Sequence, residues 1–220
     1  MARTRANDYD DKRAALLRHS ADLFARHGFT GTSINMIADA CGISKALLYH
    51  YYPSKEAVLF DLLEDHLRVL VEVLQQAAAG AKESDRLFTL ASALLEAYRG
   101  ADAEHQVQIA NLKLLSDDKQ SILKGIEREL VEIVSEAIAA ALPEVANRRD
   151  LLMPLTMSFF AMLNWHYLWF REGKGLTRDQ YARMVTDLIL SGAATSITSV
   201  EAMGSKRRMP AGKSAVSGAT

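Results

Sequence analysis

The chain has 220 residues, of which 49% are apolar and 24% charged, and its formal net charge is −1. A chain of this length and composition can bury a core, and with only 4 Pro and 1 Cys it belongs to neither the disordered nor the disulfide-rich classes. No uninterrupted run of about 18 apolar residues predicts a membrane span, and the first residues lack the apolar segment of a secretory signal. We therefore expect a cytoplasmic protein with no membrane partner.

The charges are distributed unevenly along the chain. Residues 1–57 contain eight Lys and Arg against six acidic residues, whereas residues 58–200 contain fourteen against twenty. A mildly basic head on an acidic body is a weak indication of a polyanionic partner at one end. Chance variation among solvated faces explains the same pattern equally well.

The first elements in chain order are short helices. Residues 1–10 are expected to form a loose arm. Apolar residues then recur every three or four positions over 10–27, which favours a helix. A short helix follows and ends before Gly42. A third is expected over 45–52 and is stopped by Pro53, because the residue before a proline avoids the helical region.

The rest of the chain also has helical periodicity. The expected helices span about 55–80, 84–99, 102–115, 119–141, 147–171 and 178–199. Asp118 is the expected cap of the helix that begins at 119, and Pro154 should kink its helix or lie in the first turn. Thr177 and Gln180 fit a capping box. No two-residue alternation predicts a sheet, so we expect an all-α protein of about nine helices with a disordered basic tail from Met203.

The segment GFTGTSINMIADACGISKALLYHYYPSKEA, residues 28–57, has the pattern of a helix–turn–helix. Ala38 is small enough for the second helix to cross close by, Gly42 permits the turn, and Ile43 and Leu48 supply apolar anchors. The residues left on the outer side are Ser44, Lys45, Ala46, Tyr49 and His50. A short capped helix with hydroxyls, a cation and an imidazole suits the major groove of DNA, which is about 12 Å wide.

This segment resembles the DNA-binding domain of the TetR family of bacterial transcriptional regulators. The matching residues are Gly28-Phe29, Thr32-Ser33-Ile34, Ile37-Ala38, Ala40-Cys41-Gly42-Ile43-Ser44, Leu48-Tyr49-His50-Tyr51-Tyr52 and Ser54-Lys55-Glu56. The sequence departs from the family pattern at Tyr52, where Phe is usual, and at Tyr51, where His is common. The resemblance implies a homodimer, with a DNA-binding domain at 1–55, a ligand-binding and dimerisation domain at 56–202 and a tail at 203–220.

The resemblance also implies which residues contact DNA. They are Thr32, Ser33, Ser44, Lys45, Ala46, Tyr49, His50, Tyr51 and Lys55. Thr32 and Ser33 would donate to a phosphate at a helix N-terminus, and Lys45 and Ala46 would face base edges. Ser44 would cap its helix, Tyr49 and Tyr51 would clamp the backbone, Lys55 would supply a point charge, and His50 could serve either purpose. Tyr52 is expected to pack in the core. Arg3 and Arg5 either reach the minor groove or contact nothing, and the second is favoured.

Residues 158–171 contain both tryptophans and several other aromatic residues, too many for an ordinary surface. The candidate effector-binding residues are Tyr98, Phe160, Asn164, Trp165, His166, Trp169 and Arg171. Plain core and dimer packing explains any single one of them equally well. The segment from Asn164 to Gly173 is similar to a TetR subset that senses CoA thioesters. The similarity implies such an effector, with Arg171 on its phosphates and either Arg148 or Arg149 as a further candidate.

The last two helices are expected to form the dimer contact. On the final helix, the residues assigned to one side are Tyr181, Met184, Val185, Leu188, Ile189, Gly192 and Ser196. A two-fold dimer would present two recognition helices to half-sites about 34–36 Å apart on a near-palindromic operator.

Other functions receive less support from the residues. Cys41 fits a buried small residue better than a redox sensor, and Asp102 with His105 supplies only one half-motif for a metal site. No nucleotide-binding or hydrolase motif is present, so we expect no enzymatic activity, no metal and no cofactor. A multidrug-sensing regulator with a promiscuous aromatic pocket, and a small helical metalloenzyme, remain the alternatives.

Overall fold

A computed structural model describes residues 2–207 and, within them, an entirely helical protein without a strand. The expected all-α class is thereby confirmed, with ten α-helices where about nine were predicted. The helices are α1 (Ala2–Gly31), α2 (Ile34–Ala40), α3 (Lys45–Tyr51), α4 (Lys55–Gly80), α5 (Arg86–Ala97), α6 (Asp102–Asn111), α7 (Asp117–Ala141), α8 (Arg149–Asn164), α9 (His166–Trp169) and α10 (Arg178–Arg207). Three short 3₁₀ helices lie at Glu83–Asp85, Leu112–Leu114 and Pro143–Val145.

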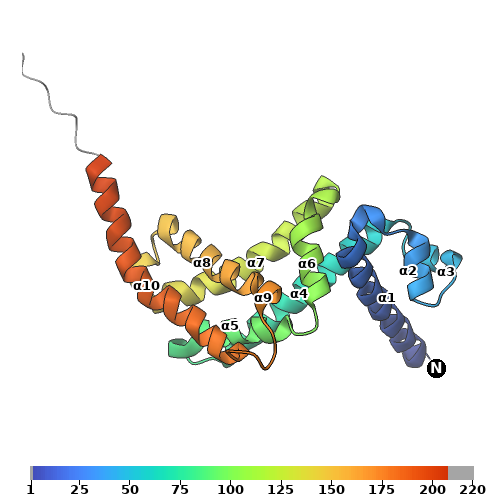
Figure 1. Cartoon of the computed structure of the whole chain (residues 1–220), viewed down its shortest axis with the longest axis horizontal. Helices are drawn as coiled ribbons and strands as arrows, with labels where there is room; N and C mark the ends of the chain where they lie inside the picture. Colours follow the sequence, from blue (N-terminus) through green and yellow to red (C-terminus); the bar gives the residue numbers. More distant parts are fainter. Residues whose placement is uncertain (1, 208–220) are drawn as a thin grey trace, which may run out of the picture.

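The molecule is elongated, with α1, α2 and α3 at one end and α10 at the other (Figure 1). Helix α4 begins beside α3 and runs into the larger group of helices, where it packs on α5 and α7. Helix α6 packs on α1, so the two ends of the molecule are joined through both α4 and α6. Within the described residues, no helix combines the length and apolar character that a membrane crossing requires.

A serine side chain caps the N-terminus of each of the three consecutive helices α2, α3 and α4. Ser33, Ser44 and Ser54 each accept a hydrogen bond from the backbone N–H three residues on, at 3.2, 3.1 and 3.2 Å. Each bond satisfies an N–H that the helix itself leaves without a partner, and such a cap stabilises a helix by about 1 kcal/mol. The seven-residue helices α2 and α3 depend on these caps, because helices this short are unstable alone.

One continuous core joins the two ends of the molecule. Helix α4 contributes buried residues along nearly its whole length: Val58, Leu59, Leu62, Leu63, His66, Leu67, Leu70, Val71 and Leu74. Their three- and four-residue spacing is the stripe expected of a helix that is covered on one side. On α10 the buried residues are Tyr181, Ala182, Val185, Thr186, Ile189 and Ala193, which pack on α5 and α8.

The structure corrects several expected boundaries. Residues 2–10 are not an arm but the start of α1, which kinks at Gly28, where φ is +70°. The helix expected over 147–171 ends at Asn164 and resumes as α9, because the backbone at Trp165 leaves the helical conformation. Pro154 lies inside α8, beyond its first turn.

Two helix ends also differ from the prediction. Helix α7 begins at Asp117 and follows Ser116, so Asp118 lies in its first turn and does not cap it. The capping box at the start of α10 is confirmed: Thr177 Oγ1 accepts from the Gln180 N–H at 3.2 Å, and Gln180 Oε1 accepts from the Thr177 N–H at 2.9 Å. Helix α10 continues through 203–207, where a disordered tail was expected, and the remainder of that tail, 208–220, lies outside the described residues.

Candidate nucleic-acid interface and effector region

The turn between α2 and α3 has the geometry that the sequence predicts. Gly42 has a φ of +64°, and the N–H of Ile43 donates to the Ala38 carbonyl at 3.0 Å. A Cβ on Gly42 would meet nothing within 4 Å, so glycine is needed for its backbone conformation and not for space. Leu48, fully buried, fixes α3 from its inner side. These contacts make α2 and α3 a helix–turn–helix.

The outer side of α3 presents a set of polar side chains to solvent. Ser44, Lys45, Ala46, Tyr49 and His50 are all exposed, as predicted. Lys45 Nζ lies 5.9 Å from the centre of the Tyr49 ring, so a cation and a phenol hydroxyl sit together on this face. Hydroxyls, an ammonium group and an imidazole can donate to phosphate oxygens and to acceptors on base edges.

Two residues assigned to phosphate contacts instead close the corner between α1 and α2. The Thr32 side chain is buried, with its hydroxyl 2.9 Å from the Gly28 carbonyl oxygen and 3.1 Å from that of Leu23. Lys55 Nζ donates to the carbonyls of Phe29 and Thr32 at 2.6 and 2.7 Å and lies over the Phe29 ring. The hydrogen-bonding groups of both side chains are engaged within the fold. The structure therefore gives no support to their assignment to phosphate contacts.

Ser33 and Tyr51 differ in their exposure to solvent. Ser33 is exposed, and its oxygen caps α2 while its hydroxyl proton stays available to an acceptor. Tyr51 is half-buried and lines a small cavity of about 310 Å³ between α1 and α3, together with Leu16, Cys41 and Leu47. Cys41 is also half-buried there, and burial raises the pKa of its thiol.

A charged network that sequence reasoning missed ties α3 to α1 and α4. Asp61 accepts from Arg13 Nε at 2.9 Å and Nη2 at 2.5 Å, and it also accepts from the Tyr52 hydroxyl. Arg13 reaches Asp65 at 3.1 Å. The hydrogen bond to Asp61 raises the pKa of Arg13, while burial and then Asp61 raise the pKa of Tyr52. Tyr52 is buried, as predicted. The Arg13–Asp61 pair could not be predicted, because its two residues lie 48 positions apart in the sequence.

A buried polar cluster lies among α4, α5, α6 and α8. The Tyr98 hydroxyl donates to Asn164 Oδ1 at 2.9 Å, and His105 Nε2 lies 3.0 Å from the Asn164 carbonyl oxygen. The His105 ring is 4.3 Å from the Tyr98 ring and 6.1 Å from that of His66, centre to centre. This group of Tyr98, Asn164, His105 and His66 is called the inner cluster below.

The inner cluster has unusual proton equilibria because it is removed from water. Burial, helped by His105, lowers the pKa of His66 to about 4. Burial likewise lowers the pKa of His105 and raises that of Tyr98. His66 Nε2 and His105 Nδ1 have no hydrogen-bond partner among the described residues. Both rings are therefore neutral at pH 7 and keep a polar atom that a bound molecule can satisfy.

The predicted effector-binding residues do not form one cluster, although the Trp169 ring lies 6.1 Å from that of His166. Tyr98 and Asn164 belong to the inner cluster, Phe160 is buried, and His166 is buried against the rings of Phe170 and Tyr181 at 4.4 and 6.0 Å. Trp165 and Trp169 are instead 49% and 53% exposed on the outer side, and Arg171 is exposed with Nη1 bonded to the Phe170 carbonyl. The aromatic segment thus divides into an inner and an outer set. Sequence reasoning missed His66, and it considered His105 only as a metal ligand.

The residues assigned to one side of α10 also divide between two faces. Tyr181, Val185 and Ile189 are buried in the chain's own core, whereas Met184 and Leu188 are exposed. Among the residues that the structure describes, no three His, Cys, Asp or Glu side chains gather closely enough to hold a metal ion.

Comparison with known proteins agrees with this arrangement. Residues 16–62 match the model of bacterial regulatory proteins of the tetR family, and residues 80–193 match that of the tetracyclin repressor-like C-terminal domain. The chain is 28% identical over 189 residues to the transcriptional repressor KstR2 of Rhodococcus jostii, covering 84% of this chain and 92% of that protein.

Solved structures are also similar. A TetR-family regulator from Bordetella parapertussis has 36% identity and a TM-score of 0.76, with 81% of this chain and 93% of that one covered. AibR, solved with isovaleryl coenzyme A and operator DNA, has 26% identity and a TM-score of 0.70, with 81% and 98% covered. With its helix–turn–helix and a family match over more than half its length, this chain belongs to the TetR family of bacterial transcriptional regulators.

Proposed function

We propose that this regulator is a repressor that binds a near-palindromic operator as a homodimer and leaves it when a small-molecule effector, a CoA thioester, binds the C-terminal helices. The observation that carries the proposal is the outer face of α3, where Lys45 and Tyr49 are exposed while Leu48 holds the helix from inside. Such a regulator acts in the bacterial cytoplasm, where its operator and CoA esters are found.

The proposed DNA contacts follow from the exposed side of α3. Lys45 faces base edges, and Ala46 lets the helix backbone approach the groove closely. Tyr49 and His50 reach the phosphate backbone, as does Ser44 beside the helix N-terminus. Phosphate contacts release counterions, so the affinity should fall steeply as salt increases.

An outer apolar surface supports the proposed dimer. Met157, Trp165 and Leu168 from the α8–α9 region and Met184 and Leu188 from α10 are each at least 40% exposed. A soluble protein rarely leaves so many large apolar side chains uncovered on neighbouring helices, which pack against each other here. A second copy related by a two-fold axis would cover them and would set the spacing of the two α3 helices.

Two features support a CoA thioester as the effector. The inner cluster combines an apolar setting with a few unsatisfied polar atoms, which is the usual character of a small-molecule site. AibR, similar to this chain over most of its length, has been solved with isovaleryl coenzyme A. Release of DNA requires the effector to prefer the dimer arrangement that does not fit the operator.

The DNA-binding part is tested by fluorescence anisotropy on fragments of the gene's own upstream region. Lys45→Ala and Tyr49→Ala should each weaken operator binding about 10- to 100-fold. Lys82→Ala, which removes an exposed cation far from α3, should leave the affinity unchanged. Unchanged affinity in both α3 variants, with folding intact by circular dichroism, would overturn the assigned interface.

The effector and dimer parts need separate measurements. A panel of acyl- and aryl-CoA thioesters should release the operator, and failure of every member would remove this effector class while leaving the DNA-binding assignment intact. Light scattering should give a dimer mass for the wild type. Leu188→Asp, which places a charge on the outer apolar surface, should shift the protein towards monomer.

A further inference from the structure

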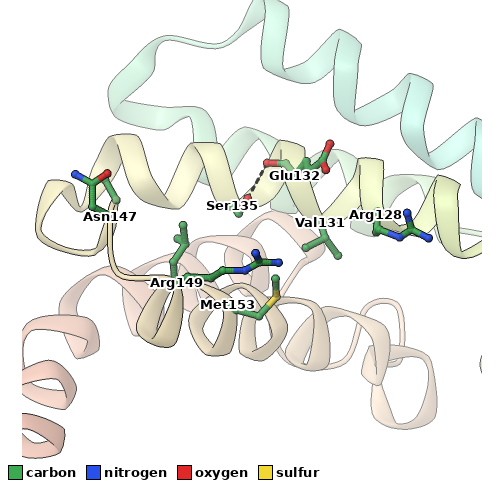
Figure 2. A pocket seen from close by; sticks show the side chains of 9 residues that line it. Arg128, Val131, Glu132, Ser135, Asn147, Arg149 and Met153 are labelled. Carbon is green, nitrogen blue, oxygen red and sulfur yellow. Dashed lines mark hydrogen bonds between the residues drawn. The ribbon is translucent and has the colours of Figure 1, made fainter.

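A groove between α7 and α8 lies apart from both the α3 face and the inner cluster. It has a volume of about 390 Å³, within the range of small-molecule sites. Its walls are the middle of α7, the turn before α8 and the first turns of α8 (Figure 2). The lining residues are Arg128, Val131, Glu132, Ser135, Ala146, Asn147, Arg149, Leu152 and Met153.

Two arginines on this lining have no ionic or hydrogen-bond partner among the described residues. Figure 2 shows Arg149 extending from the first turn of α8 into the space between the two helices, next to Met153 and facing Val131. Arg128 lies further along α7. The neighbouring Arg148 differs, because it is paired with Asp150 at 3.0 Å. With Glu132 as the one acidic lining residue, the groove keeps a net positive charge.

The chemistry of the lining fits one part of a CoA molecule. Guanidinium groups form paired, charge-assisted hydrogen bonds with phosphate oxygens, and two of them are available here. Val131, Leu152 and Met153 offer an apolar wall for a flat base, and the Asn147 amide can pair with the edge of an adenine. We propose that this groove binds the adenine nucleotide end of a CoA thioester, with Arg128 and Arg149 on its phosphates. The inference rests on the proposed effector class.

The distance along α8 agrees with the length of such a ligand. Arg149, Met153, Phe160 and Asn164 fall within about 60° of one another around the helix, so one stripe leads from the groove to the inner cluster. From Met153 to Asn164 the helix rises about 16 Å. The arm between the pyrophosphate and the sulfur of CoA has about twelve bonds. Four extended amino-acid residues contain the same number of backbone bonds, so the extended arm is about 14 Å long. With the phosphates beside the Arg149 guanidinium, at the level of Met153, the thioester end therefore passes Phe160, about 10 Å further along the helix, and ends short of Asn164.

The test uses the full-length protein and free CoA, so that the identity of the acyl group does not matter. Isothermal titration of the wild type with CoA up to millimolar concentrations should give saturable binding. Arg128→Gln/Arg149→Gln should weaken it at least tenfold, because each loses charge-assisted bonds to phosphate. The matched control, Lys113→Gln/Lys124→Gln, removes the same charge from exposed positions outside the groove and should bind CoA like the wild type.

A local measurement accompanies the affinity. In protein labelled with ¹³C-methyl methionine, the Met153 signal, assigned through Met153→Leu, should shift on addition of CoA. Equal CoA affinity in the two double variants, or no CoA binding by the wild type, would overturn the inference. If CoA thioesters still released the operator under those results, the proposed function would stand and only the groove assignment would fall. Operator binding without ligand should be the same in all variants.

Discussion

The buried imidazole of His66 should make the stability of the protein depend on pH in a way that one substitution removes. In the folded protein its pKa is lowered from 6.5 to about 4, first by burial and second by His105. A base with a lowered pKa binds its proton more readily in the unfolded chain, so protonation favours unfolding. The free energy of unfolding is therefore unaffected by His66 above pH 6.5 and falls as the pH is lowered towards 4.

The size of the effect follows from the two pKa values. At pH 5 the unfolded imidazole is almost fully protonated and the folded one is mostly neutral, which costs about 2 kcal/mol of stability. Below pH 4 the loss levels off at about 3 kcal/mol, since each pKa unit corresponds to about 1.4 kcal/mol. A change of 2 kcal/mol is a large share of the stability of an ordinary domain.

Urea denaturation of wild type and His66→Leu at pH 8 and pH 5 measures this difference. The wild type should lose about 2 kcal/mol more than the variant between the two pH values. Leu74→Ala, a cavity-forming change in the same helix, provides the control: it should lower stability equally at both pH values. If His66→Leu kept the full pH dependence of the wild type, the reasoning from burial would be refuted.

Three further predictions concern the N-terminal helices and are measured by thermal or urea denaturation. Gly42→Ala should destabilise by about 1 kcal/mol through its positive φ alone, and an unchanged midpoint would contradict this account. Leu48→Ala should cost about 2–5 kcal/mol and weaken operator binding, because α3 loses its buried anchor. Asp61→Asn should cost about 1–3 kcal/mol by breaking a partly buried pair with Arg13, whereas Asp65→Asn, at the exposed end of the network, should cost less than about 1 kcal/mol. Equal losses of stability for the two aspartate variants would contradict the role given to burial.

The candidate DNA-binding face could be predicted because its signals are local. Serine caps, the Gly42 turn and the buried anchor Leu48 fix both the helix and the side that it turns outward. Thr32 and Lys55 were assigned differently because their partners are carbonyl groups of the corner between α1 and α2. A sequence pattern does not show which carbonyls a folded chain leaves without a helical partner.

The effector region was less predictable for a related reason. In an aromatic segment such as 158–171, every face of the helix is apolar, so periodicity does not tell which side is buried. The break at Trp165 and the position of α10 decide that Asn164 turns inward and Trp165 outward. His66 and His105 come from helices that meet only in the fold.

The amino-acid order alone thus determined the helical class, nearly all the helix positions, the turn after α2 and the outer residues of α3, because these depend on contacts between residues a few positions apart. The tertiary structure alone decided the inner cluster, the Arg13–Asp61 pair and the groove between α7 and α8. Each of these joins side chains from different helices, and where two helices cross is set by the packing of the whole core.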